Sequence, residues 1–335
     1  MYDVIFDFSS SSGGGGKKRA EAYAAELETR GLRVLFLLND RLARFNGSQR
    51  YVSFEYVRKG SFERLLNDGK RVQHYHGKAL WYFAYGVPIY QKIGERNWYH
   101  LSNVLPFARG RYSAPLGLKM KMGLLGQRVR RRRANIDQFS AESLFGRTCL
   151  KERLCLEPDG ITLQNGVDET WGGPTERQGR HDSRYAVTVG TYSYKRLDRV
   201  RDVFMHVRGK MGLEKLRIVG DTAGVAKSLS RSPHVELLGS MDLSQVLPLV
   251  AGADLFISAS EIENSSNAVL EALSLDTESV LTCIPSHLEM VDRKGVDSFV
   301  LNGVEYMIAG KKDLVPEYRK SWSEVVDAML KAMGF

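Results

Sequence analysis

The second half of the chain alternates short apolar runs with helical patterns, and this alternation limits the possible folds more than any other feature. The apolar runs have the length of buried strands and lie at residues 184–190, 215–220, 235–239, 254–258, 279–283 and 298–301. Helical patterns separate the first four runs, at residues 198–208, 223–230 and 243–251. Strands that alternate with helices form a parallel sheet with helices on its faces. We therefore predict an α/β fold with a doubly wound sheet.

The first half follows the same pattern less regularly. Strands are predicted at residues 2–8, 32–38, 71–76, 97–103 and 136–143, and helices at residues 17–27 and 78–92. A polar, glycine-rich stretch at residues 171–182 is the best linker in the sequence. The sequence therefore predicts two doubly wound, Rossmann-like domains that face a cleft.

The composition is that of a globular protein with a basic balance. The 335 residues are 43% hydrophobic, which excludes a disordered chain. The net charge of +9 favours a phosphate-bearing ligand, a nucleic acid or an anionic membrane as partner. Three cysteines without a CxxC pair are typical of a reducing compartment. The first residues do not resemble a signal peptide, and the uncharged run at residues 79–91 is too short to span a bilayer. We expect a cytoplasmic protein, or one peripheral to a membrane.

Two glutamates follow the apolar run at residues 254–258. Glu263 and Glu271 are separated by seven residues, and the small polar residues between them are suited to capping a helix. In open α/β sheets, ligands bind at the carboxyl ends of the strands. The pattern therefore predicts a ligand site that offers carboxylates and free backbone N–H groups.

A glycine-rich loop at residues 13–16 lies between the first strand and the first helix. Gly14, Gly15 and Gly16 allow a close approach of the backbone to an anion, and the helix N-terminus supplies N–H groups and a positive dipole end. The loop matches neither G-x-G-x-x-G nor Walker A. A phosphate-binding loop is the favoured interpretation, and a flexible linker is the alternative.

Histidines lie near the ends of two predicted strands, at His74, His76 and His100. A single histidine is more often structural than catalytic. His100 is the best candidate for a functional residue, because Ser102 and Asn103 follow it at the same sheet edge.

Residues 116–133 form the most basic segment of the chain. Its cations are Lys119, Lys121, Arg128, Arg130, Arg131, Arg132 and Arg133. Leu118, Met122 and Leu125 share roughly one helical face beside them, so the segment is read as a solvated helix face or as a peripheral membrane contact. Nucleic-acid binding is a third interpretation, although few aromatic residues accompany the arginines.

Together these motifs resemble the retaining GT-B glycosyltransferases of family 4, in the family's order and over nearly the whole chain. The glycine loop, His100, the Asn-Gly-Val-Asp sequence at residues 165–168 and the E-x7-E pattern at Glu263 and Glu271 are similar to family motifs. Ser321 and Trp322 resemble the start of the family's closing helix. The resemblance implies an acceptor-binding domain at residues 1–160, a nucleotide-sugar-binding domain at 161–316, and a helix at 317–335 that crosses back to the first domain.

The resemblance also implies residue roles toward a nucleotide-diphosphate sugar, the donor substrate. Glu263 would accept hydrogen bonds from the donor sugar, and Glu271 would hold the ribose. Further donor-binding candidates are the diphosphate-facing N–H groups of Asn267, Ala268 and Val269, the base pocket at Leu238 and Gly239, and the loop at Gly190 and Thr191.

One position departs from the family. The family has Gly-Arg and then a lysine after the first strand of the second domain, whereas Gly190 is followed here by Thr191. Lys195 and Arg196 are therefore the cations available to neutralise the leaving phosphates, and the sequence does not decide which points inward. No Asp-x-Asp occurs, in agreement with a site that needs no metal or cofactor. By resemblance, the reaction retains the anomeric configuration, with His100 orienting the sugar or stabilising charge.

We therefore predict a hexosyltransferase-type glycosyltransferase that acts on a glycan or lipid-linked acceptor in cell-surface polysaccharide or lipopolysaccharide synthesis. A nucleotide-binding oxidoreductase is a rival, but it would need G-x-G-x-x-G and an acid about 20 residues later; here the next strand ends in Asn39 and Asp40. A nucleic-acid-binding protein that uses residues 128–133 is the third possibility, although no nucleic-acid partner is expected. Strong, salt-sensitive RNA or DNA binding would favour it.

Overall fold

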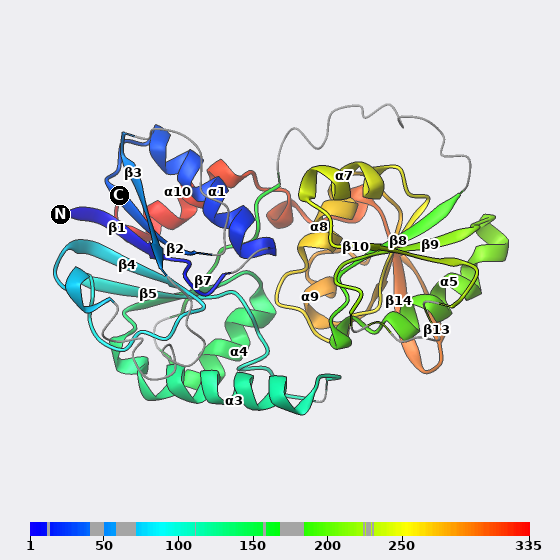
Figure 1. Ribbon diagram of the computed structural model, residues 1–335, viewed down its shortest axis with the longest axis horizontal. Helices are drawn as coiled ribbons and strands as arrows, with labels where there is room; N and C mark the ends of the chain where they lie inside the picture. Colours follow the sequence, from blue (N-terminus) through cyan, green and yellow to red (C-terminus); the bar gives the residue numbers. More distant parts are fainter. Residues whose placement is uncertain are drawn as a thin grey trace. The chain divides into compact units, whose positions relative to one another are not determined.

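The protein folds into two units, seen in a computed structural model (Figure 1). The structure describes residues 1–11, 14–40, 50–57, 72–110, 112–156, 159–167, 184–223, 225, 229 and 231–335. The first unit comprises Met1–Arg109, Met120–Gly166 and Trp322–Phe335, and the second comprises Gly110–Lys119 and Val167–Ser321. The predicted linker at residues 171–182 and Asp168 lie outside the described residues.

The first unit is built on a seven-stranded sheet of order β3-β2-β1-β4-β5-β6-β7, in which all neighbouring strands are parallel. Its strands are β1 (Tyr2–Asp7), β2 (Val34–Asn39), β3 (Val52–Val57), β4 (Ala79–Tyr85), β5 (Arg96–Leu101), β6 (Gln138–Ala141) and β7 (Ile161–Thr162). Its helices are α1 (Gly14–Thr29), α3 (Leu116–Arg131), which belongs to this unit from Met120 onward, α4 (Leu144–Leu154) and α10 (Trp322–Met333). Short 3-10 turns, η1 (Gln73–Tyr75) and η2 (Arg133–Asn135), complete it.

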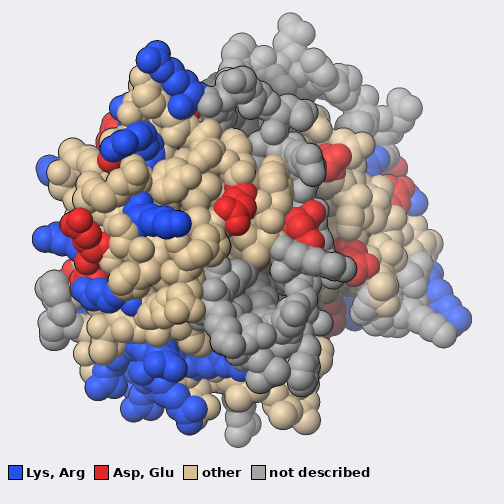
Figure 2. Space-filling view, turned by 60° about the vertical axis from the view of Figure 1, so that its left-hand side comes forward, with Lys and Arg blue, Asp and Glu red and all other residues tan. Residues whose placement is uncertain are grey.

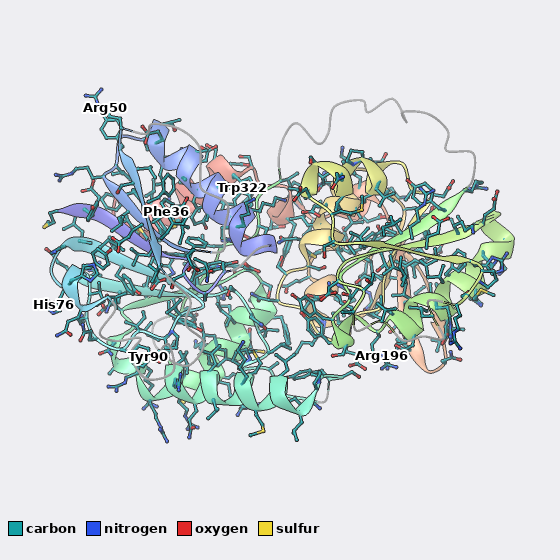
Figure 3. The ribbon with its side chains drawn as sticks, viewed as in Figure 1. Phe36, Arg50, His76, Tyr90, Arg196 and Trp322 are labelled. Carbon is teal, nitrogen blue, oxygen red and sulfur yellow. The ribbon has the colours of Figure 1, made fainter. Side chains whose placement is uncertain are left out.

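Aromatic residues fill the core of the first unit. Phe6 on β1 stacks on Phe36 on β2, with ring centroids 4.9 Å apart. Tyr23 on α1 meets Phe6 edge to face at 5.9 Å and Trp322 on α10 at 6.0 Å. Phe36 and Trp322 both lie inside this unit (Figure 3). The last helix of the chain therefore packs with the first helix over the amino-terminal sheet.

The second unit has the sheet order β10-β9-β8-β11-β12-β14-β13. Its strands are β8 (Tyr185–Val189), β9 (Lys215–Val219), β10 (Val235–Gly239), β11 (Leu255–Ser258), β12 (Ser279–Thr282), β13 (Asp297–Leu301) and β14 (Val304–Ala309). Its helices and 3-10 turns are η4 (Ser193–Lys195), α5 (Leu197–Met211), α7 (Leu243–Ala251), α8 (Asn267–Ser274), α9 (Pro285–Leu288), η5 (Lys311–Asp313) and η6 (Pro316–Tyr318). The five strands from β10 to β12 are parallel, whereas β14 is antiparallel to both β12 and β13.

Two local predictions were wrong. Residues 78–92 do not form a helix, because Ala79–Tyr85 is the central strand β4, and its aromatic side chains pack on both faces of a sheet. The strand predicted at residues 71–76 is the 3-10 turn η1 from Gln73 onward. The helix predicted at residues 223–230 lies mostly outside the described residues. No helix in the described ranges has both the length and the apolar character needed to cross a bilayer.

The order of strands fixes where a ligand can bind in each unit. In the second unit, β8 connects through α5 to β9 on one side, and α7 leads the chain back to β11 on the other side. In the first unit, the corresponding reversal lies between β1 and β4. Ligands of doubly wound sheets bind at such switch points, beyond the carboxyl ends of the strands. A ligand is therefore expected at the loops after β8 and β11 in the second unit, or at the loops after β1 and β4 in the first unit.

Candidate active site

In the second unit, the loop after β8 carries Lys195 into the switch point. Gly190 directly follows β8 with φ +100°, and a Cβ atom on it would lie 3.2 Å from the Lys195 Cε atom. Thr191 follows, its side chain packed closely against Gly220 at the end of β9. The turn η4 then presents Lys195 at its last position. Glycine is needed here because the lysine stem crosses directly over the backbone.

Glu263 meets this lysine from the loop after β11. The Lys195 Nζ atom lies 2.5 Å from a Glu263 carboxylate oxygen, and their side chains are only 14% and 12% exposed. The Ser260 hydroxyl donates to the same carboxylate at 2.9 Å. The N–H of Glu261 donates to the Tyr194 carbonyl at 2.9 Å, which ties the two loops together. The structure therefore brings together two residues that the sequence places 68 positions apart.

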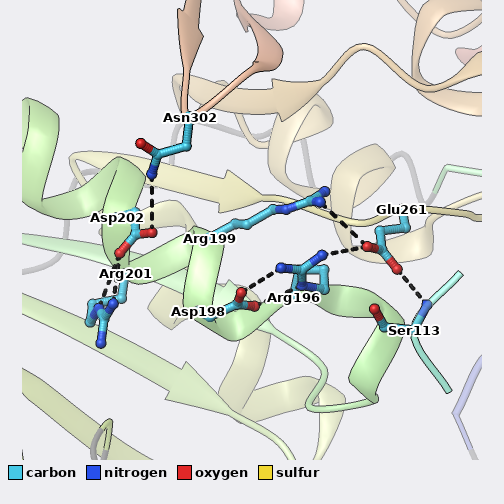
Figure 4. Close-up of polar contacts among 8 residues, drawn as sticks. All are labelled: Ser113, Arg196, Asp198, Arg199, Arg201, Asp202, Glu261 and Asn302. Atoms are coloured by element: carbon cyan, nitrogen blue, oxygen red, sulfur yellow. Dashed lines mark hydrogen bonds and ion pairs between the residues drawn. The ribbon is translucent and has the colours of Figure 1, made fainter.

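Arg196 is held in a different network (Figure 4). Its guanidinium pairs with Asp198 at 2.6 Å and with Glu261, and Arg199 lies 3.4 Å from Glu261. The Ser113 N–H also donates to Glu261, at 2.5 Å. The hydrogen bond to Asp198 raises the pKa of Arg196, and Arg196 lowers the pKa of Asp198. Burial alone would raise the pKa of Glu261, but the Ser113 N–H and Arg196 lower it overall. Of the two candidate cations, Lys195 therefore pairs with Glu263 at the predicted site, whereas Arg196 pairs with Asp198 and Glu261.

The start of α8 offers backbone donors beside Glu263. The N–H of Leu270 bonds to the Ser266 carbonyl at 3.0 Å, so the N–H groups of Asn267, Ala268 and Val269 precede the first intrahelical bond. The Ser265 and Ser266 hydroxyls are buried and have no hydrogen-bond partner within the described part of the chain. Helix N-termini of this kind bind anions.

The remaining candidates of the second unit lie on α8 and at the end of β10. Glu271 is on α8 and only 5% exposed. Gly239 ends β10 with φ +75°, and its carbonyl accepts from the Gly220 N–H at 2.8 Å. Leu238 beside it is exposed. β10 is two strands away from β8, so Leu238 and Gly239 lie at the same sheet edge but farther from Lys195.

His287 is a buried histidine that the sequence interpretation missed. It lies on α9, and its Nδ1 atom is 2.9 Å from the Thr282 carbonyl oxygen, so Nδ1 is the donor. Its Nε2 atom is buried without a hydrogen-bond partner among the described residues. Burial lowers the pKa of His287 to about 4, and Glu263 and Lys195 both act on it electrostatically. A histidine four residues after a predicted strand was too weak a signal to single it out.

In the first unit, the loop between β1 and α1 is closely packed. Gly14, Gly15 and Gly16 form the start of α1, with Gly14 at φ +58°, and residues 12 and 13 of the loop lie outside the described residues. The Ser10 hydroxyl donates to the Tyr85 carbonyl at 2.9 Å. A Cβ atom on Gly16 would lie 2.2 Å from the Ser11 Oγ atom and 3.2 Å from the Tyr85 ring. The glycine at position 16 therefore lets the loop fold against the helix.

We expect Gly16→Ala to destabilise the first unit by about 1–3 kcal/mol, because the added methyl group forces the loop away from α1. Gly209→Ala is the matched control: Gly209 is inside α5 and has open space around it, so the same change should stabilise by about 0.5–1 kcal/mol. Urea unfolding monitored by tryptophan fluorescence measures both. Equal stability of Gly16→Ala and the unchanged protein would contradict this packing.

His100 is completely buried at the end of β5. Its ring stacks on Tyr85, with centroids 5.2 Å apart, and its Nδ1 atom lies 2.8 Å from the Ser140 hydroxyl. Trp98 Nε1–H donates to that hydroxyl at 2.7 Å, which leaves the Ser140 proton available to Nδ1. The Nε2 atom lies 3.9 Å from Glu142. Burial lowers the pKa of His100 to about 4.

Arg19, also missed from the sequence, is a fully buried cation in this region. Its guanidinium donates to the Tyr23 hydroxyl, to the carbonyls of Leu163 and Gln164, and to the Asn165 side chain, at 2.8–3.1 Å. Glu142 lies 3.7 Å away. Arg19 thus joins α1 to the turn after β7. The sequence offers no reason to single out Arg19, because it follows Lys17 and Lys18 in a run of cations that is typical of a solvent-exposed helix start.

The two buried histidines predict a pH dependence of stability. Both pKa values fall to about 4 in the folded protein, whereas an unfolded histidine titrates near 6.5, so the unfolded chain binds more protons between these values. Stability is therefore complete above about pH 6.5 and decreases toward pH 4, by roughly 2–3 kcal/mol per histidine. Charged neighbours are Arg19 and Glu142 for His100, and Glu263 and Lys195 for His287.

Urea unfolding at pH 7, 6 and 5 measures this effect before most carboxylates titrate. His206→Gln, at an exposed position, serves as a control that should leave the slope unchanged. Equal stability at pH 5 and pH 7 would show that neither imidazole is buried in its neutral form.

Comparison with known families gives a match within the second unit. Residues 183–317 match the family Glycosyl transferases group 1. That span begins two residues before β8 and includes Lys195, Glu263 and α8. A search of curated proteins by sequence returned no match.

Solved structures resemble the whole chain. HepE from Anabaena in complex with UDP-glucose has a TM-score of 0.62 at 14% identity, covering 100% of this chain and 91% of that one. Sucrose-phosphate synthase from Thermosynechococcus elongatus has a TM-score of 0.65 at 12% identity, covering 99% and 95%. WaaG, a glycosyltransferase involved in lipopolysaccharide biosynthesis, has a TM-score of 0.60 at 12% identity, covering 99% and 92%. These likenesses confirm the predicted GT-B fold.

Proposed function

We propose that this protein is a glycosyltransferase that binds a nucleotide-diphosphate sugar on its second unit and transfers the sugar with retention of anomeric configuration. The observation that carries the proposal is the Lys195–Glu263 pair at the switch point between β8 and β11, inside the span that matches a glycosyltransferase family. A half-buried cation beside a carboxylate and a helix N-terminus suits a ligand with both phosphate and hydroxyl groups. HepE, with a similar fold, is a UDP-glucose complex.

In this proposal each group acts on a different part of the donor. Lys195 and the N–H groups at the start of α8 neutralise the diphosphate, and Glu263 accepts hydrogen bonds from the sugar hydroxyls. Glu271 holds the ribose, and the end of β10 receives the base. Gly190 and Thr191 shape the loop that positions Lys195. Arg196 supports that loop through Glu261 and Asp198 instead of contacting phosphate.

The reaction then requires no covalent enzyme intermediate. The bond between the sugar C1 atom and the diphosphate oxygen breaks, and the acceptor oxygen bonds to C1 on the same face. The acceptor proton passes to a phosphate oxygen of the departing nucleoside diphosphate. Lys195 stabilises the negative charge that develops on that leaving group. No step uses a metal ion. The complete burial of His100 favours a positioning role, through its neighbours Ser140 and Glu142, over direct contact with the sugar.

The proposed acceptor is a glycan or a lipid-linked sugar used in the synthesis of cell-surface polysaccharide or lipopolysaccharide. WaaG, which has a similar fold, acts in lipopolysaccharide biosynthesis, and this supports the acceptor class.

The configuration of the transferred sugar tests the proposed mechanism. With an α-linked donor, we expect proton NMR of the new glycoside to show the coupling constant of an α-linkage, together with equimolar release of nucleoside diphosphate. A β-linked product would contradict retention. Glycoside formation and nucleoside diphosphate release only in the presence of added divalent metal would contradict the metal-independent site.

A further inference from the structure

The excess of positive over negative charge comes from one segment around α3. Residues 96–136 contain ten lysines and arginines and no aspartate or glutamate. The rest of the chain has 38 basic and 39 acidic residues, so it is almost neutral. Figure 2 shows a dense group of Lys and Arg along the lower edge of the molecule, where Figure 1 places α3. The net charge of +9 therefore comes from this one segment and not from the rest of the chain.

The exposed face of α3 is apolar as well as basic. Leu116, Met120 and Leu124 follow one another at intervals of four residues, so they form one stripe, and they are 73%, 61% and 49% exposed. The sequence predicts Leu118, Met122 and Leu125 on one face, but this face is not the one left in solvent: Met122 is buried, and Leu118 and Leu125 are half-buried. Those three residues lie on the inward-facing side of the helix, which is why a different stripe is left in solvent.

A pocket opens beside this stripe. It has a volume of about 520 Å³ and lies between α3, α4 and the segment after β5. Phe107, Met120, Leu124 and Leu154 give it an apolar lining, and Arg130 and Arg153 add two guanidinium groups to its wall. Arg153 Nε–H donates to the Phe107 carbonyl at 3.2 Å, which holds that arginine at the pocket. Glu152, the acid next to it on α4, lies 3.8 Å from Arg109. Apolar walls with fixed cations suit an amphiphile with an anionic head.

We propose that the exposed stripe of α3, its cations and this pocket form a docking site for an anionic phospholipid bilayer. Arg130 and Arg153 receive a lipid phosphate, and the stripe of Leu116, Met120 and Leu124 enters the boundary between head groups and acyl chains. Cations attract the anionic surface, and exposed apolar side chains gain from leaving water. Among the described residues, no acid forms an ion pair with Lys119, Lys121, Arg130, Arg131 or Arg133, so their charges are available to the bilayer.

Vesicle sedimentation tests the site without donor or acceptor, so its result is independent of the proposed transfer activity. Vesicles of phosphatidylcholine alone are compared with vesicles that also contain phosphatidylglycerol. We expect binding only to the second kind. The triple variant Arg130→Gln/Arg131→Gln/Arg133→Gln should lower partitioning about a hundredfold, because each cation near an anionic surface contributes roughly fivefold.

A matched control removes the same charge elsewhere. Lys210→Gln/Lys311→Gln/Lys312→Gln changes three exposed lysines of the second unit and should bind vesicles like the unchanged protein. Met120→Ser/Leu124→Ser keeps all charges and should weaken binding about tenfold. Circular dichroism confirms that each variant is folded.

Three results would overturn the proposal. The first is equal binding by the arginine variant and the lysine control. The second is equal binding to vesicles with and without phosphatidylglycerol. The third is tighter binding to a single-stranded RNA oligonucleotide than to the vesicles, which would assign the arginines to nucleic acid.

Discussion

Replacing Glu263 with alanine is expected to lower kcat/KM for sugar transfer by about 10²–10³-fold or more, because the donor sugar loses its principal acceptor and Lys195 loses the carboxylate that fixes it. Release of nucleoside diphosphate in the presence of an acceptor measures the rate. Glu214→Ala, at an exposed position in the same unit, is the control and should keep full activity. Unchanged turnover of Glu263→Ala would remove that residue from the site.

The stability of the same variants separates positioning from folding. Removing either partner of the Lys195–Glu263 pair leaves a half-buried charge and should cost about 1–3 kcal/mol. The double variant Lys195→Ala/Glu263→Ala should lose less stability than the two single changes together, because they share one interaction. Strict additivity would contradict the pairing.

Replacing Arg19 with methionine is expected to destabilise the protein by about 3–5 kcal/mol, the largest single effect on stability that we predict. The change removes four hydrogen bonds and leaves the Leu163 and Gln164 carbonyls and the Asn165 side chain without their donor. Buried polar groups that lose their partners cost free energy. Urea unfolding measures the effect.

Arg201→Met is the control for Arg19. Arg201 is 38% exposed and pairs with its neighbour Asp202, so its loss should cost less than about 1 kcal/mol. A loss of similar size for both arginines would mean that the buried network of Arg19 does not stabilise the fold.

Much of the fold could be predicted because the strands of the second unit are continuous apolar runs between helical patterns. β8, β9, β10 and β11 were all found in this way. Strand β4 was mistaken for a helix because it is a single apolar run without alternation, and periodicity does not distinguish such a strand from a buried helix. β14 was missed because its strand Val304–Ala309 follows β13 in a short hairpin at the sheet edge.

The candidate site was predictable in part. Glu263 stands out because it follows a buried strand, but sequence could not choose between Lys195 and Arg196, which are neighbours. The choice depends on the left-handed backbone of Arg196, at φ 51°, and on Asp198 and Glu261, which pair with its side chain. The pair with Glu261 joins residues 65 positions apart in the chain. Arg19 and His287 were missed because their partners come from other elements.

Binding of a nucleotide sugar to the second unit is the central claim, and a thermal-shift panel of UDP-, GDP- and ADP-sugars tests it most directly. A ligand that binds only the native state at a hundred times its Kd stabilises the protein by about 2.7 kcal/mol. We expect at least one nucleotide sugar to raise the Tm of the unchanged protein by several degrees, and the Lys195→Ala variant to lose most of that shift. No response of the unchanged protein to any of these donors would contradict the proposed function.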